Sequence, residues 1–399
     1  MNAYILGKRI IALIILTGRL AIAAPFIPTA DDQILERLPN AAQAKARDRL
    51  QLHLTRQPQS LNLTLQLAQQ FIKQTRESGD PRYLGRAEAL LTPWLNHSDP
   101  PVPVRVMRAI LSQANHDFDS ALTDLNAAIQ RDPTHAQAWL TRSSIFQVRG
   151  DYTHAQQDCR ELLRLQQKTV AEICLASIAS LNGHAQHAYN LLAKIAAQQD
   201  AASATELIWL ESLLADIAER LGDSQAAQRH YQTALDHLTR TGNKPELFLL
   251  TAFADYWLEQ DRPQEVISLL ESHQSADTAL LRLAIATQRS HHPMASTYIQ
   301  ELQTRFAINR QRGSNLHLRE EARFILSVFN RAEQALPLAE ANWKIQREPT
   351  DARLLLETAL AAGKPQAAHP VLTWLTATRL EDKRLQSLVK ALSNTETFK

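Results

Sequence analysis

The chain has 399 residues, of which 10 are glycine and 6% are aromatic, and its formal net charge is +2. One hydrophobic core rarely serves more than about 250–300 residues, so a chain of this length either divides into domains or grows by repetition. Glycine, at roughly a third of its usual ~7%, is too scarce for most β folds and for phosphate-binding loops, and the recurring Ala, Leu, Gln, Arg and Glu predict an all-α protein.

The N-terminus has the layout of a secretory signal peptide over residues 1–23. Residues 8–9 are basic, residues 10–17 form an apolar run, and residues 21–23 (Ala-Ile-Ala) fit a small-x-small cleavage site. The apolar run is too short to cross ~30 Å of hydrocarbon, and Arg19 interrupts its extension. We therefore expect cleavage, and an uncleaved membrane anchor is the alternative.

Export would change the charge of the chain. Cleavage removes three positive charges, Lys8, Arg9 and Arg19, and takes the formal net charge from +2 to −1. A near-neutral protein has no long-range field for nucleic acid or anionic lipid, so we expect neither as a partner. The style of the signal peptide indicates a bacterial protein that is periplasmic or otherwise associated with the cell envelope. Residues 24–46 are then an N-terminal tail and a lead-in helix.

Residues 47–240 predict a series of helical repeats with a period of about 34 residues. Alanine marks the same point of successive repeats at Ala87, Ala121, Ala155 and Ala188, with spacings of 34, 34 and 33 residues. Ala227 follows after a longer spacing of 39 residues. Recurrence of both helices in phase indicates a solenoid rather than one globular core.

The clearest repeat supplies a diagnostic pattern of large and small residues. Trp139, Ser143 and Phe146 occupy its first helix, a Gly-Asp-Tyr turn follows, and Ala155 and Leu162 occupy its second helix. The second half of the preceding repeat has the matching residues Phe118, Ala121, Leu125, Ala128 and Pro133. This pattern resembles the tetratricopeptide repeat (TPR) family. The resemblance implies a right-handed α-solenoid whose first helices line a concave groove for a protein or peptide partner.

Residues 241–399 predict degenerate repeats of the same kind. Four further helix pairs are expected at 247–258 with 266–270, 279–286 with 295–302, 318–329 with 335–345, and 354–362 with 367–375, with Pro349 closing the third pair. The whole chain then holds about nine antiparallel hairpins, and a last helix at about 381–392 caps the stack. Small residues at the seams let the helices approach closely, and large residues fill the grooves between hairpins.

Catalytic and cofactor motifs are missing from the sequence. It has no phosphate loop, paired-glycine fingerprint, serine elbow or metalloprotease helix. Adjacent histidines point apart, so we interpret His291-His292 as a solvated loop rather than a metal site. We expect no cofactor, no metal and no enzymatic activity. The alternative is a non-catalytic subunit, or a rare enzyme, acting on an envelope substrate.

Candidate partner contacts lie on the predicted first helices. Arg105, Arg108 and Arg142 form a basic strip suited to acidic peptide ends, and Gln137 and Ser144 complete the set. The alternative for the arginines, which we favour, is a structural role with the side-chain stem along the core. The Lys/Asn carboxylate clamp of chaperone-binding relatives is absent, because Leu140 and Ser144 stand at its helix positions.

Three further features have two interpretations each. The charged run 319–323 is expected to be a solvated helix start with an acidic first turn, with a partner-facing patch as the alternative. Trp343 is expected in the core, with a surface anchor as the alternative. Cys159 and Cys174 fall on neighbouring helices, so they form either a disulfide or two buried thiols.

Overall fold

All regular secondary structure in the described part of the chain is helical. A computed structural model describes residues 41–198, 203–242, 244–311 and 317–396. The expected signal peptide lies outside these residues. The chain divides into two units, residues 1–49 and residues 50–399, and the second unit holds the repeats. Helix α1 (Ala41–Arg56) spans the boundary between the two units.

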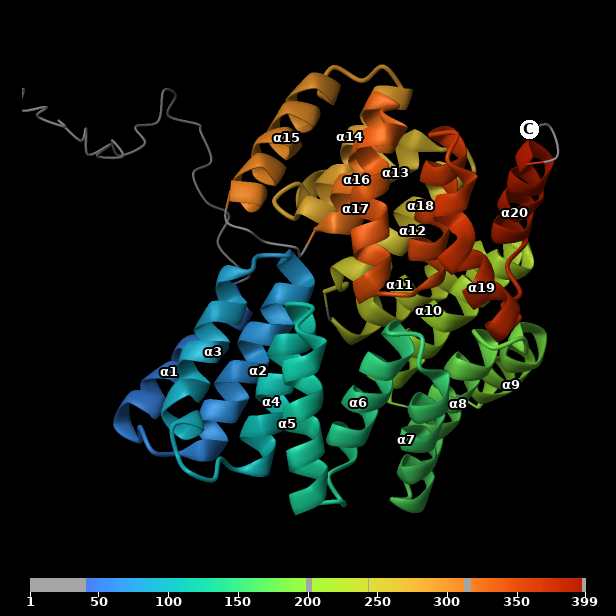
Figure 1. The fold of residues 1–399 in the computed structure, drawn as a ribbon. Coiled ribbons are helices and arrows are strands. Elements are labelled where there is room, and N and C mark those ends of the chain that lie inside the picture. The colour runs from blue at the N-terminus through green and yellow to red at the C-terminus, as the bar shows by residue number, and fades with distance from the viewer. Residues whose placement is uncertain (1–40, 199–202, 243, 312–316, 397–399) are drawn as a thin grey trace, which may run out of the picture. The chain divides into compact units, whose positions relative to one another are not determined.

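Nine antiparallel hairpins follow one another in the described part of the second unit (Figure 1). The five N-terminal hairpins are α2 (Leu61–Ser78) with α3 (Arg82–Leu95), α4 (Val102–Ala114) with α5 (Phe118–Arg131), α6 (Ala136–Val148) with α7 (Tyr152–Arg164), α8 (Lys168–Ser180) with α9 (Ala185–Ala197), and α10 (Ala204–Leu221) with α11 (Ser224–Thr241). The four C-terminal hairpins are α12 (Leu247–Glu259) with α13 (Pro263–Leu270), α14 (Asp277–Arg289) with α15 (Ala295–Gln311), α16 (Leu318–Phe329) with α17 (Ala332–Ile345), and α18 (Pro349–Ala361) with α19 (His369–Thr378).

The expected all-α solenoid with a capping helix is confirmed. Helix α20 (Lys383–Glu396) follows the ninth hairpin and packs against α18 and α10. One expected boundary is wrong. Pro349 does not close the eighth hairpin but stands at the first turn of α18, where proline is tolerated because that backbone position has no helical acceptor.

Three of the second helices begin at a turn that the repeat sequence encodes. Asp117, Asp151 and Asp223 cap α5, α7 and α11, and each carboxylate accepts a hydrogen bond from the backbone N–H three residues on. Gly150 before the second of these caps has φ 76°, which a residue with a side chain rarely adopts. The turn reverses the chain, and the cap satisfies a donor that the new helix leaves free.

The C-terminal hairpins pack back onto the middle of the chain. The α7–α8 region and the α16–α20 region share one hydrophobic core, in which Cys159, Ala171 and Ile178 join Leu355 and Val371. Helix α20 contacts α10, and the backbone N–H of residue 347 donates to the carbonyl of residue 148 at 2.7 Å. The repeats therefore bury surface against distant hairpins as well as against their neighbours.

Trp343 lies in this shared core. Its ring is 6% exposed and meets the ring of Trp374 edge to face, with centroids 5.3 Å apart. The expectation of core packing is confirmed.

The charged run 319–323 begins α16 with the expected acidic first turn, Glu320 and Glu321, but it is not a solvated face, and that part of the expectation is wrong. Arg319 forms ion pairs with Asp351 at 2.6 Å and with Glu348, and Arg323 pairs with Asp255 at 2.8 Å. Burial opposes ionisation of Asp255, but Arg282 and Arg323 hold its pKa below the usual range. The run is charged because it joins α16 to α12 and α18, contacts that local helix patterns do not reveal.

The two cysteines form a disulfide between α7 and α8. The Cα atoms of Cys159 and Cys174 are 5.8 Å apart, and the Ser143 hydroxyl lies within 3.4 Å of both sulfurs while donating to the Ala155 carbonyl. The bond closes a sequence separation of 15 residues.

Reduction of this disulfide should lower the free energy of unfolding by about 3 kcal/mol, because the bond removes loop entropy from the unfolded chain. Chemical denaturation with and without a thiol reductant measures the change. The double variant Cys159→Ala/Cys174→Ala serves as the control and should show no response to the reductant. Two reactive thiols in the unreduced, unfolded protein would contradict the bond.

Candidate functional site

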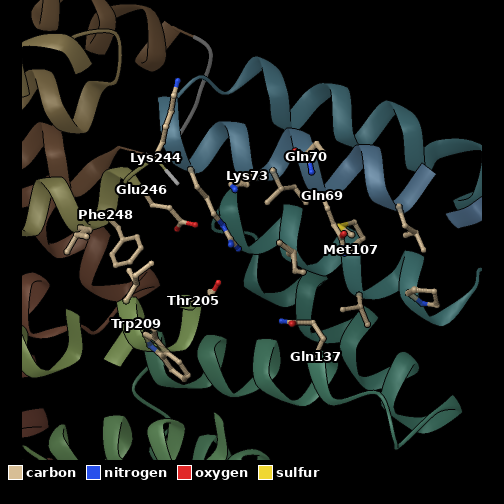
Figure 2. Close-up of a pocket in the computed structure, with 18 of the residues that line it drawn as sticks. Gln69, Gln70, Lys73, Met107, Gln137, Thr205, Trp209, Lys244, Glu246 and Phe248 are labelled. Carbon is tan, nitrogen blue, oxygen red and sulfur yellow. The ribbon is translucent and has the colours of Figure 1, made fainter. Parts of the chain in front are cut away.

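A cavity of about 740 Å³ lies on the inner side of the repeats. Its walls come mainly from the first helices of hairpins one, two, three, five and six, namely α2, α4, α6, α10 and α12, with Leu238 added from α11. Figure 2 shows side chains from these helices converging on one space, with Met107 opposite Trp209 and Phe248. The concave surface implied by the repeat pattern is therefore present as a cavity between hairpins one to three and hairpins five and six.

The floor of the cavity is apolar. Ile72 and Met107 are buried, and Ile208 and Trp209 line the space from α10. Phe248 lies at the rim and is 51% exposed, although it is a large hydrophobic residue. An aromatic side chain held in water beside an apolar floor is a typical anchor for a partner.

One end of the cavity is rich in charge. Lys73 and Arg76 from α2 face Lys244 and Glu246 just before α12 (Figure 2 labels Lys73, Lys244 and Glu246). Lys73 lies 3.8 Å from the carboxylate of Glu77. Arg76 and Lys244 form no ion pair with any residue that the structure describes.

Glu77 is the buried member of this charged end. It is 5% exposed, and its Oε1 atom has no hydrogen-bond partner among the described residues. Burial raises the pKa of the Glu77 carboxyl above its usual range, against the opposing effect of Lys73 and Lys244. A carboxyl with a raised pKa stays protonated to a higher pH, and in that form it does not compensate the charges of Lys73 and Lys244.

The sequence-derived candidates divide between the cavity and the hairpin seams. Gln137 lines the cavity and donates a hydrogen bond to the Thr141 hydroxyl at 3.0 Å. Ser144 accepts a hydrogen bond from Gln113 at 2.9 Å and does not line the cavity. Arg105 donates to the Pro100 carbonyl at 3.3 Å and lies 3.7 Å from Asp99.

Arg108 and Arg142 each bind an aspartate of their own hairpin. Arg108 pairs with Asp124, and Arg142 holds both oxygens of Asp158 at 2.9 and 2.7 Å. Both aspartates are buried and lie 16 residues after their arginine. We infer a structural role for both arginines, because their guanidinium groups satisfy carboxylates that would otherwise be buried without a partner.

The sequence did not indicate Arg76, Lys244 or Phe248 as site residues. They belong to hairpins one and six, and no local spacing relates them. In the sequence, Phe248 is only one of several apolar residues at the start of a largely apolar helix. Its exposure, which marks it as a site residue, is visible in the structure alone.

Among the described residues, no group of three or more His, Cys, Asp or Glu is placed to hold a metal ion. None of the described helices combines the length and the apolar character needed to cross a membrane.

No family model matches the chain, and no curated protein matches it. Solved structures do match. A tetratricopeptide repeat protein from Parabacteroides merdae is 17% identical over 65% of this chain and 90% of its own, with a TM-score of 0.41. A Rap protein complexed with competence and sporulation factor is 14% identical over 89% of this chain and 94% of its own, with a TM-score of 0.45. The human IFIT1 dimer with m7Gppp-AAAA is 12% identical over 89% of this chain and 86% of its own, and its TM-score is also 0.45.

These likenesses concern the fold alone. The helical hairpins and their buried small residues make the chain a TPR-like solenoid protein.

Replacing Arg142 with methionine should lower the free energy of unfolding by about 2 kcal/mol, because Asp158 then stays buried without its partner. Chemical denaturation measures the loss. The double variant Arg142→Met/Asp158→Leu should recover part of it, since both polar groups are then absent. A single variant as stable as the parent would contradict the structural role.

Proposed function

We propose that this protein is a non-catalytic scaffold of the bacterial cell envelope that holds a segment of a partner protein in its inner cavity. The single observation that carries the proposal is the cavity itself, about 740 Å³ in volume, with an apolar floor and an exposed aromatic rim. A space of this size is in the usual range for a buried ligand or several side chains of a peptide. The signal-peptide layout of residues 1–23 supports placement in the envelope.

The chemistry of the cavity favours one type of segment. Phe248, Trp209 and Met107 offer contacts for a bulky apolar side chain. Arg76 and Lys244 are cations without an ion-pair partner in the described residues, so an acidic group of the partner would complete the charged end. The occupant is therefore a partner segment that carries an apolar side chain next to a carboxylate.

A photo-crosslinking residue tests this site when it replaces Phe248 in the exported protein. Leu163 on α7 is a matched control, because it is also a large apolar residue and is 43% exposed. A discrete partner should crosslink at position 248 and not at position 163. Charge reversal by Arg76→Glu with Lys244→Glu should weaken binding of that partner roughly tenfold, the sum of two exposed charge contacts.

Equal crosslinking at the two positions would contradict the cavity as the binding site. Binding unaffected by the double charge reversal would contradict the acidic partner.

A further inference from the structure

A contact between distant hairpins adjoins the charged end of the cavity. The last turn of α2 meets the first residue of α12 and the residue before α14. Leu247 and Ala276 are 7% and 2% exposed, so the contact is packed. Gly79 and Leu247 are separated by more than 160 positions in the sequence, and this end is therefore held by tertiary packing alone.

Gly79 fits this contact because it has no side chain. It ends α2 with φ 70°, and a Cβ atom there would lie 2.7 Å from a methyl group of Leu247 and would overlap the Cβ atom of Ala276. Real Cβ atoms do not approach other carbon atoms this closely. Any side chain at position 79 therefore forces the two sides of the contact apart.

Glu77 lies two residues before this contact and is buried with an unsatisfied carboxylate oxygen. The groups that face it are Lys73 on its own helix and Lys244 and Glu246 on the α12 side. His273, before α14, also faces Lys244, and burial lowers the pKa of its imidazole. Arg76 lines the cavity beside them.

We propose that the contact of α2 with α12 is a gate for the partner-binding cavity, closed while Glu77 is protonated and loosened when Glu77 ionises. The role of this gate in partner binding rests on the function proposed above. The pH-dependent opening of the contact does not depend on that function. An ionised carboxylate buried without a full set of hydrogen bonds destabilises the closed contact, and opening lets water reach it.

The direction of the pH response follows from linkage. Burial raises the pKa of Glu77 in the closed state, and an open state restores it toward the ordinary value for glutamate, about 4.3. The closed state therefore binds the proton more tightly, so rising pH favours the open state. Glu219 is a second carboxyl whose pKa burial raises, to about 8, but it pairs with Arg384 at the C-terminal closure. A variant of Glu77 therefore distinguishes the pH response of this carboxyl from that of Glu219.

Distances between spin labels test the gate in the full mature chain without any partner. The labels are attached at Gln66→Cys on α2 and at Gln274→Cys before α14, two exposed positions on either side of the contact. Between about pH 4 and about pH 9, we expect the mean distance to grow by about 5 Å, roughly one helical turn. The variant Glu77→Gln should keep the short distance throughout, and Gly79→Ala should give the long distance at every pH.

Gly363→Ala is the matched control for backbone strain. Gly363 also has positive φ, 62°, but has open space around it, so this variant should respond to pH as the parent does. Two results would overturn the gate: a spin-label distance that does not change with pH in the parent, or one that still changes with pH in Glu77→Gln. Both results hold even if the Gly79 variant does not fold. Failure of crosslinking at position 248 would instead refute the proposed function and leave the distance result intact.

Discussion

The close approach of paired helices at a buried alanine is the constraint on which the rest of this structure depends. Ala87, Ala121, Ala155, Ala188 and Ala227 are all fully buried, one in each of the five N-terminal hairpins. A larger side chain at these seams would separate the helices and change the rotation of one hairpin on the next. Because each repeat adds the same small rotation, the chain curves until distant hairpins meet.

Contacts between distant hairpins add a shared core, ion pairs and a helix contact, none of which a stack with contacts only between neighbouring hairpins would have. The C-terminal hairpins share a core with α7 and α8, Arg384 links α20 to Glu219 on α10 and Glu259 on α12, and α2 reaches α12 at Gly79. The cavity is lined from both sides by such distant hairpins. In the proposed function, its apolar floor and two cations that have no ion-pair partner among the described residues, Arg76 and Lys244, contact the partner.

The sequence predicted the helices better than the contacts between them. Most boundaries of the helix pairs and of the closing α20 were expected within a few residues of their observed positions, because periodic small residues and Gly/Pro breaks are local signals. An exception is α15, which continues to Gln311 instead of ending near residue 302. Arg319 and Arg323 were misinterpreted, since their partners Asp351 and Asp255 lie on other hairpins. Phe248, Arg76 and Lys244 were missed for the same reason. Their proximity is a product of the accumulated curvature, which no single repeat encodes.

Amide hydrogen exchange with and without the partner captured at position 248 tests the central claim most directly. The account predicts added protection on the inner helices α2, α4, α10 and α12, and unchanged exchange on the second helices α5 and α7. Protection concentrated on α5 and α7, with the inner helices unaffected, would show that the partner binds the outer surface and would contradict a scaffold that works through its inner cavity.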